Sequence, residues 1–255
     1  MRCVGVIRII CIAAVLCIAG KADAVAEPAL ADTDDDWSVG LSGGSRPEHF
    51  LYFSGFDLWG RGSSGYGGLL WSPGGLNTDG FTLKLLLAGG TYLYSGGGND
   101  FRGTYLLASI LPGYRIKRGD VEIKLFGGLD LQHHGVSPDD PANSLKGNHV
   151  GARFNVDVWW EPIPASMMLT TSLTGSTIGS NYGVRGAAGC KVLDRFWAGP
   201  EIEASGDRIY RQYRIGAHIT SLRFGEFEWA FGAGYVEDNS HRSGLYGRFS
   251  LLTRR

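Results

Sequence analysis

The sequence predicts an all-β fold, a single antiparallel up-and-down transmembrane β-barrel of about 12 strands. Apolar and polar residues alternate with a period of two through almost the whole chain after residue 48, and continuous helical periodicity is found nowhere there. The alternating segments are roughly twice the usual strand length of about five or six residues, which suits tilted membrane strands of about 9 to 11 residues. Aromatic residues gather near the segment ends, as in the interfacial girdles of membrane barrels.

The first 26 residues have the order of a secretory signal peptide. Arg2 and Arg8 supply positive charge, the apolar run IICIAAVLCIAG follows, and KADAVA offers small residues for cleavage near Ala24 or Ala26. The apolar run is shorter than the roughly 20 residues that a spanning helix needs. Residues 1–26 are therefore expected to direct export and then to be removed.

An acidic and Gly-rich stretch, residues 27–48, follows the predicted signal peptide. Its sequence, EPALADTDDDWSVGLSGGSRPE, does not alternate, and we expect it to be a loose periplasmic leader. The remaining residues, 49–255, are expected to form the barrel in the outer membrane.

Twelve alternating segments make up this barrel region, and an even number is usual for bacterial single-chain barrels. In the segment GEFEWAFGAGYVED, Phe227, Phe231 and Tyr235 lie on one parity, whereas Glu226 and Glu228 lie on the other. A soluble sandwich would turn these aromatic residues inward, and a membrane barrel would turn them toward lipid. The predicted segments are, in order, 49–60, 64–73, 80–95, 101–117, 120–133, 148–161, 165–177, 181–193, 195–205, 209–223, 225–237 and 243–254.

Other segments repeat this pattern. FTLKLLLAGGTYL sets Leu83, Leu85 and Leu87 against Thr82 and Lys84, and VEIKLFGGLDL and HVGARFNVDVWWEP alternate in the same way. Segment length, the signal peptide and the aromatic girdles together favour the barrel over the sandwich. We therefore expect the apolar parity to face lipid and the charged parity to line the lumen.

The connections differ in length at the two ends of the predicted barrel. Connections after even segments are mostly tight, such as RGD at 118–120, and several after odd segments are longer, such as 95–103 and 133–148. Outer-membrane barrels have short periplasmic turns and longer extracellular loops, so the longer connections are expected outside the cell.

Composition and motifs exclude several classes of function. The chain has 24 Lys and Arg residues against 25 Asp and Glu residues, so no basic surface for nucleic acid is expected. The GGG at 96–98 lacks the following helix and the Lys-Ser/Thr pair of a phosphate-binding loop. His133 and His134 are adjacent on an extended segment and point to opposite faces, which suits neither a shared metal nor a catalytic triad. No cofactor and no metal site is predicted.

Charged residues of both signs share the lumen parity, and we expect an ion-pair network among them. Glu201 and Glu203, like Glu226 and Glu228, have the i, i+2 spacing that would also suit the paired carboxylates of a glycosidase. The counter-charges of Arg185, Arg214 and His218 favour ion pairing instead. The candidate network comprises Lys84, Glu122, Lys124, Arg153, Asp157, Arg185, Glu201, Glu203, Arg214, Glu226 and Glu228.

Two tryptophans, Trp59 and Trp159, lie on the polar parity of their segments. Sugar rings stack on indole rings, so a glucan contact is one interpretation of these side chains. The other is membership of an interfacial girdle, where tryptophan is abundant.

Three long runs resemble one known family. GFDLWGRGSSGYGGLLWSPGGLNTDGFTLKL, HHGVSPDDPANSLKGNHVGARFNVDVWWEP and GPEIEASGDRIYRQYRIGAHITSLRFGEFEWAFGAGYVED are similar to the cellulose biosynthesis protein BcsS family of alphaproteobacteria. The resemblance covers about residues 48 to 254. It implies a small outer-membrane barrel linked to bacterial cellulose production, and it supplies no catalytic residues.

Three functional hypotheses follow from these observations. The first is a non-enzymatic accessory protein of cellulose biosynthesis or export, in contact with outer-membrane lipid and with the export machinery or the glucan chain. The second is a narrow general porin. The third is an outer-membrane enzyme acting on lipid or glucan, which would need a nucleophile and base near one rim, and the sequence offers no convincing pair.

We predict that the mature protein begins at Val25 or Glu27 and sediments with outer membranes. The small residues before each position suit signal peptidase, and the alternating segments suit insertion as a barrel. Mass spectrometry of the N-terminal peptide identifies the first residue of the mature protein, and cell fractionation shows whether the protein sediments with outer membranes. Recovery as a periplasmic monomer in solution would contradict the barrel.

Overall fold

The computed structural model describes residues 48–96, 98–208 and 210–255. The predicted signal peptide and all but the last residue of the predicted leader therefore lie outside the described residues. A single short 3₁₀ helix, η1 (Ile178–Ser180), accompanies the described strands. The strands are β1 (Phe50–Trp59), β2 (Gly62–Trp71), β3 (Gly80–Gly96), β4 (Asn99–Arg118), β5 (Val121–Ser137), β6 (Gly147–Ile163), β7 (Met167–Ser176), β8 (Tyr182–Val192), β9 (Phe196–Gly206), β10 (Arg211–Phe224), β11 (Phe227–Asp238) and β12 (Ser243–Arg254).

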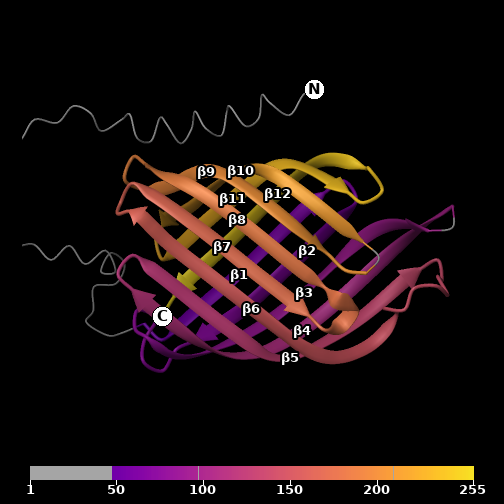
Figure 1. Ribbon diagram of the computed structural model, residues 1–255, viewed down its shortest axis with the longest axis horizontal. Helices are drawn as coiled ribbons and strands as arrows, with labels where there is room; N and C mark the ends of the chain where they lie inside the picture. The colour runs from indigo at the N-terminus through magenta and orange to yellow at the C-terminus, as the bar shows by residue number, and fades with distance from the viewer. Residues whose placement is uncertain (1–47, 97, 209) are drawn as a thin grey trace, which may run out of the picture. The chain divides into compact units, whose positions relative to one another are not determined.

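Every strand pairs antiparallel with its neighbour in the chain, and β1 pairs with β12 to close the barrel (Figure 1). The closing register runs from Leu51↔Arg254 to Trp59↔Tyr246. This arrangement confirms the predicted up-and-down barrel of 12 strands. None of the described helices is long and apolar enough to cross a membrane.

The barrel has two distinct ends. The terminal end carries the start of β1 and the end of β12, and the distal end is opposite, on the right in Figure 1. At the distal end β3 and β4 continue pairing to Gly96↔Asn99, so the loop expected at 95–103 is a tight hairpin. The prediction of a long loop at 95–103 was wrong. Backbone pairing continues through a Gly-rich stretch that has no apolar alternation, so the sequence pattern does not indicate strands there. Strands β3 to β6 are consequently the longest, and their hairpins project beyond the others (Figure 1).

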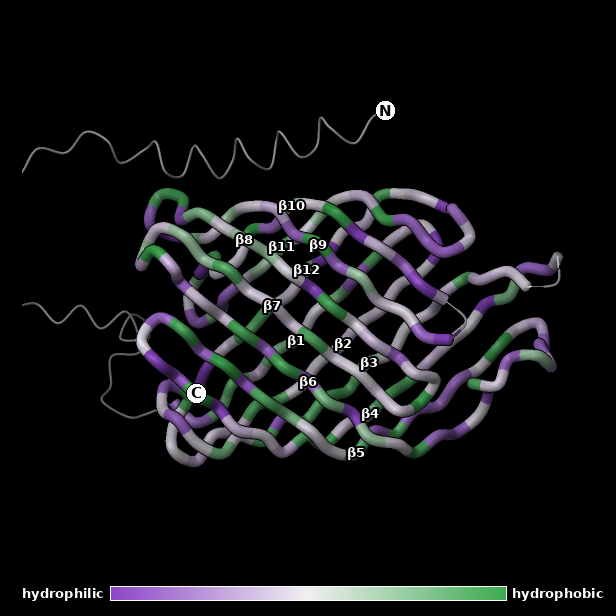
Figure 2. Tube along the Cα trace, viewed as in Figure 1, coloured by the Kyte–Doolittle hydropathy of each residue, from purple (hydrophilic) through white to green (hydrophobic). Residues whose placement is uncertain are grey.

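The two parities face opposite surroundings, as alternation requires. Phe227, Phe231 and Tyr235 are 43%, 42% and 45% exposed on the outside of β11. On the inner parity Val236 is fully buried, and the Glu228 side chain is only 11% exposed. Figure 2 shows hydrophobic positions alternating along the strands, with hydrophilic residues gathered in the hairpins at the ends. The aromatic parity therefore faces outward, as predicted.

The connection between β2 and β3 folds into the terminal end of the lumen. Leu76 is 5% exposed and packs with the inward-facing Leu70, Leu111 and Phe126. Its backbone N–H donates to the Glu48 carbonyl over 2.7 Å, which holds the connection in place. These four side chains, here called the apolar plug, form an apolar cluster on the inner side of the barrel.

We predict that Leu129→Arg lowers the free energy of unfolding by about 2–4 kcal/mol, because Leu129 is 45% exposed near the middle of β5 and would carry charge into lipid. The control Lys124→Gln should cost much less, since Lys124 lies on the lumen parity beside Glu122. Urea unfolding in lipid vesicles measures both, and reversed sensitivities would mean that the two faces are assigned the wrong way round.

Candidate functional site

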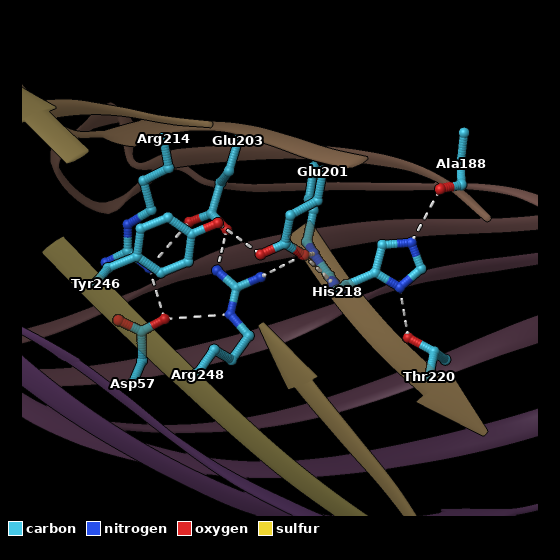
Figure 3. A network of polar contacts seen from close by, with 10 residues as sticks. Asp57, Ala188, Glu201, Glu203, Arg214, His218, Thr220, Tyr246 and Arg248 are labelled. Carbon is cyan, nitrogen blue, oxygen red and sulfur yellow. Dashed lines mark hydrogen bonds and ion pairs between the residues drawn. The ribbon is translucent and has the colours of Figure 1, made fainter. Parts of the chain in front are cut away.

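Six charged side chains form a connected group across one wall of the lumen, here called the arginine belt (Figure 3). They come from neighbouring strands because inward-facing positions pair directly across the ladders, as in Arg185↔Glu203, Glu203↔Arg214 and Arg248↔Asp57. Equal numbers of arginines and carboxylates leave the group without net charge. The members are Asp57, Arg185, Glu201, Glu203, Arg214 and Arg248.

Arg248 is the centre of the belt. Its Nε lies 3.2 Å from Asp57 Oδ2, its Nη1 lies 3.8 Å from Glu201 Oε2, and its Nη2 contacts Glu203. Arg214 Nη1 is 2.5 Å from the same Asp57 oxygen and 3.9 Å from Glu203 Oε1, and Arg185 Nη2 is 2.5 Å from Glu201 Oε2. Each carboxylate therefore contacts two guanidinium groups, and breaking one pair disturbs the others.

Tyr246 supports the belt from the same strand as Arg248. Its hydroxyl donates to Glu201 Oε1 over 2.7 Å, and the Arg214 guanidinium lies 5.0 Å from the centre of its ring. Glycine at two neighbouring positions leaves room for the Tyr246 and Glu201 side chains. A Cβ at Gly216 would lie 2.4 Å from the Tyr246 hydroxyl, and a Cβ at Gly232 would lie 2.6 Å from Glu201 Oε1.

A second ion pair lies on the wall formed by β4 to β7. Arg153 donates through Nε and Nη2 to the two oxygens of Asp130, both over 3.1 Å. Asp130 is completely buried and also accepts hydrogen bonds from Ser109, Gln132 and Ser176. This carboxylate is a structural group, because every direction from which it can accept is occupied by the protein.

The remaining predicted charges pair closer to the terminal end. Lys84 donates to Asn155 Oδ1 over 2.5 Å, lies 3.6 Å from Asp157 Oδ2, and lies 5.2 Å from the centre of the Phe126 ring. Lys124 Nζ is 2.6 Å from Glu122 Oε1. Lys84 lies beside the apolar plug, because it pairs across the ladders with Leu70 on β2 and with Leu111 on β4.

Two predicted members stand apart from the belt. Glu226 lies in the turn between β10 and β11, and its carboxylate pairs with Arg255 at the terminal end. Glu228 is inward-facing and pairs with Arg223 and Arg254 over 3.7 and 3.8 Å. The two glutamates therefore do not form a carboxylate pair on one strand.

His218 was expected to supply a counter-charge to the glutamates. Its ring instead bonds to the Thr220 hydroxyl over 2.9 Å and to the Ala188 carbonyl over 3.1 Å (Figure 3). The sequence-based selection also left out Asp57, Asp130 and Arg248 as network members. Their inward parity was the available signal, but parity does not reveal which residues meet across the barrel.

At the terminal end, outside the strands, Asp79 accepts a hydrogen bond from the Arg118 guanidinium and one from the Lys117 backbone N–H. The Arg118 hydrogen bond, followed by the backbone one, holds the pKa of this carboxyl below its usual value. The contact ties the β2–β3 connection to the end of β4.

A cavity of about 470 Å³ lies between the belt and the distal end, and we call it the distal vestibule. Asp57, Arg214 and Arg248 of the belt line it on one side, and Trp59 and Tyr210 line it near the mouth. Trp159 is at the other end of the barrel, where its Nε1 donates to Glu161 over 3.0 Å. The two tryptophans that the sequence offered as glucan contacts are therefore far apart along the lumen.

Among the described residues, no group of three or more His, Cys, Asp or Glu side chains could hold a metal ion. The acidic groups of the lumen face arginine or lysine instead, as in Glu201 with Arg185 and Asp157 with Lys84. The arrangement provides ion pairs and hydrogen bonds rather than a ligand sphere.

A closed antiparallel barrel with apolar side chains outside and a charged lumen is the architecture of an outer-membrane β-barrel protein. The family model of the cellulose biosynthesis protein BcsS matches residues 51–255. The chain belongs to this family, as the resemblance of its sequence implied. None of the curated proteins is similar in sequence.

Solved outer-membrane barrels share the fold at low sequence identity. The COG4313 outer membrane channel from Pseudomonas putida F1 is 9% identical with a TM-score of 0.51, and the match covers 89% of this chain and 100% of the channel. LpxR from Salmonella typhimurium is 11% identical with a TM-score of 0.48, covering 80% and 99%. The translocator domain of the autotransporter NalP from Neisseria meningitidis is 14% identical with a TM-score of 0.46, covering 86% and 92%. The match to the channel supports the barrel fold and nothing finer.

We predict that Arg248→Met destabilises the barrel by about 3 kcal/mol or more, because it leaves three carboxylates beside two arginines in a buried site. The control Arg255→Met removes a guanidinium that is 61% exposed and should cost less than about 1 kcal/mol. Urea unfolding of both variants gives the comparison. Equal costs would mean that the belt contributes no more than a surface pair.

Proposed function

We propose that this protein is a non-enzymatic accessory of cellulose biosynthesis or export in the outer membrane, and that the polymer does not pass through its lumen. Membership of the BcsS family supports the link to cellulose. The observation that carries the rest of the proposal is the arginine belt, whose side chains reach into the lumen from β1, β8, β9, β10 and β12.

Passage of a glucan chain along this wall would disturb the ion pairs of the belt. A buried pair that loses one partner costs about 3–5 kcal/mol, and the belt links several pairs. Barrels of eight strands are filled by side chains and those of sixteen to eighteen hold an aqueous channel, so twelve strands lie between these limits. The apolar plug, with Leu76 at 5% exposure, adds an obstacle at the terminal end.

An accessory role that does not conduct the polymer needs a contact surface, and we infer that the distal loops supply it. The connection between β5 and β6 is held in place by Asp140, which accepts from the Tyr94 hydroxyl over 2.8 Å, and by Asn143, which donates to the same hydroxyl over 2.8 Å. A positioned loop suits contact with the export machinery or the emerging polymer. The acidic leader, outside the described residues except for Glu48, is the second candidate for this contact.

The non-enzymatic part of the proposal rests on how the carboxylates are used. Glu201 is 2% exposed and accepts from Arg185 and Tyr246, and Glu203 contacts Arg248. A glycosidase needs one protonated carboxyl group and one free carboxylate beside the scissile bond. Two carboxylates that are both paired with arginines suit neither role.

We predict that deleting the gene reduces or mislocalises cellulose while synthase activity in isolated membranes stays intact. The purified barrel should conduct small ions poorly in planar bilayers, because the belt and plug obstruct the lumen. Arg248→Met is the variant to compare in planar bilayers, and it should raise the conductance of the barrel. Unchanged cellulose in the deletion strain, together with free conduction of small solutes, would contradict the accessory role and support the porin hypothesis.

A further inference from the structure

The distal vestibule has the size and lining of a ligand site. Its volume of about 470 Å³ is within the range of about 300–1,000 Å³ that small-molecule sites occupy. Asp57, Arg214 and Arg248 of the belt border its inner side. A ligand entering from the distal end would therefore meet these charged side chains.

Aromatic rings form platforms near the mouth of the vestibule. Tyr210, from the connection before β10, has its ring centre 6.3 Å from that of Trp59 on β1 and 6.0 Å from that of Tyr92 on β3. Strands β3 and β10 are on well-separated walls of the closed barrel, so Tyr210 reaches across the mouth. Tyr105 and His134 stack 6.4 Å apart and provide a second platform in the same cavity.

The charges that line the vestibule are compensated by the protein itself. Four arginines line it, and each contacts a carboxylate: Arg153 with Asp130, Arg185 with Glu201, Arg214 with Asp57, and Arg248 with Glu203. Without surplus positive charge, the vestibule has no field that would attract a uronate, a phosphate or another anion. Aromatic faces beside compensated polar groups suit an uncharged ligand with apolar C–H faces and many hydroxyls.

Three buried polar atoms of the lining residues have no hydrogen-bond partner among the described residues, and one of them is Arg214 Nε. His134 is 8% exposed, and its Nε2 is hydrogen-bonded to Gln132 Oε1 over 2.7 Å. Its Nδ1 has no hydrogen-bond partner among the described residues. The Tyr210 hydroxyl is the third such atom. His134 and Tyr210 belong to the aromatic platforms, and because both atoms are closed to solvent, a ligand hydroxyl would reach them only after these rings move.

We propose that the distal vestibule binds a short segment of uncharged β-glucan, which enters from the distal end, stacks on Tyr92, Tyr105 and Tyr210, and stops at the arginine belt. The choice of glucan among neutral saccharides rests on the proposed function in cellulose biosynthesis. The site is a blind receptor for a chain end or a loop of polymer, and it carries out no chemistry on the ligand.

Calorimetry on the full mature protein in detergent tests this inference with cellohexaose as the probe. Cellohexaose is expected to bind, and Tyr92→Ala and Tyr210→Ala are each expected to weaken binding at least tenfold. Tyr213→Ala is the matched control, because Tyr213 is 57% exposed on the outer face of β10, and it should bind like the unchanged protein. Heat-dependent gel mobility verifies that each variant still forms a closed barrel.

Three results would overturn the assignment: no binding of cellohexaose, equal or tighter binding of hexagalacturonate, or equal binding of the α-linked maltohexaose. Equal losses in Tyr92→Ala and Tyr213→Ala would also overturn it, since the outer face would then matter as much as the vestibule. Failure of the proposed function looks different. In that case cellohexaose binds as expected, and cellulose output in the deletion strain is unchanged.

Discussion

The closed ladder of backbone hydrogen bonds is the constraint on which the other features depend, because hydrocarbon offers no partner for an unpaired N–H or C=O group. Pairing of β1 with β12, from Leu51↔Arg254 to Trp59↔Tyr246, leaves none of the described strands with a free edge. Once the barrel is closed, each side chain has only lipid or lumen as its surroundings. Phe231 is accordingly 42% exposed on the outside, and Asp130 is fully buried within.

Sorting by parity places many charges inside one small barrel, and this creates a second requirement. Charges in a poorly hydrated interior must be paired, and their remaining hydrogen-bonding positions must be filled. Arg153 and Asp130 satisfy this with a two-point contact and three further donors to the carboxylate. The belt pairs each carboxylate with two arginines, and Arg214 Nε has no hydrogen-bond partner among the described residues. The glycines opposite the belt follow from the same requirement, because a Cβ at Gly232 would meet Glu201.

The fold and the inward placement of most candidate charges could be predicted from the sequence, because a period of two is a local property. The partners of each charge could not. Arg248 contacts Glu203 from 45 residues away, and Arg214 contacts Asp57 from 157 residues away. Such pairs depend on the stagger of the strands around the barrel. This stagger cannot be predicted from the residues of any single segment. For the same reason, parity grouped Trp59 with Trp159, although one lines the vestibule and the other lies near the terminal end.

The two halves of the lumen differ in a way that a conducting pore would not require. Toward the terminal end, Lys84 lies between Phe126 and Asp157, and Leu76 packs against inward-facing hydrocarbon. Toward the distal end, aromatic rings and ion-paired side chains surround open volume. An apolar layer in a lumen opposes the passage of ions and polar solutes, because they lose their hydration there. An interior with apolar packing toward one end and an aromatic-lined cavity toward the other suits the proposed binding of a polymer segment, and such binding would let an accessory barrel act without conducting the polymer.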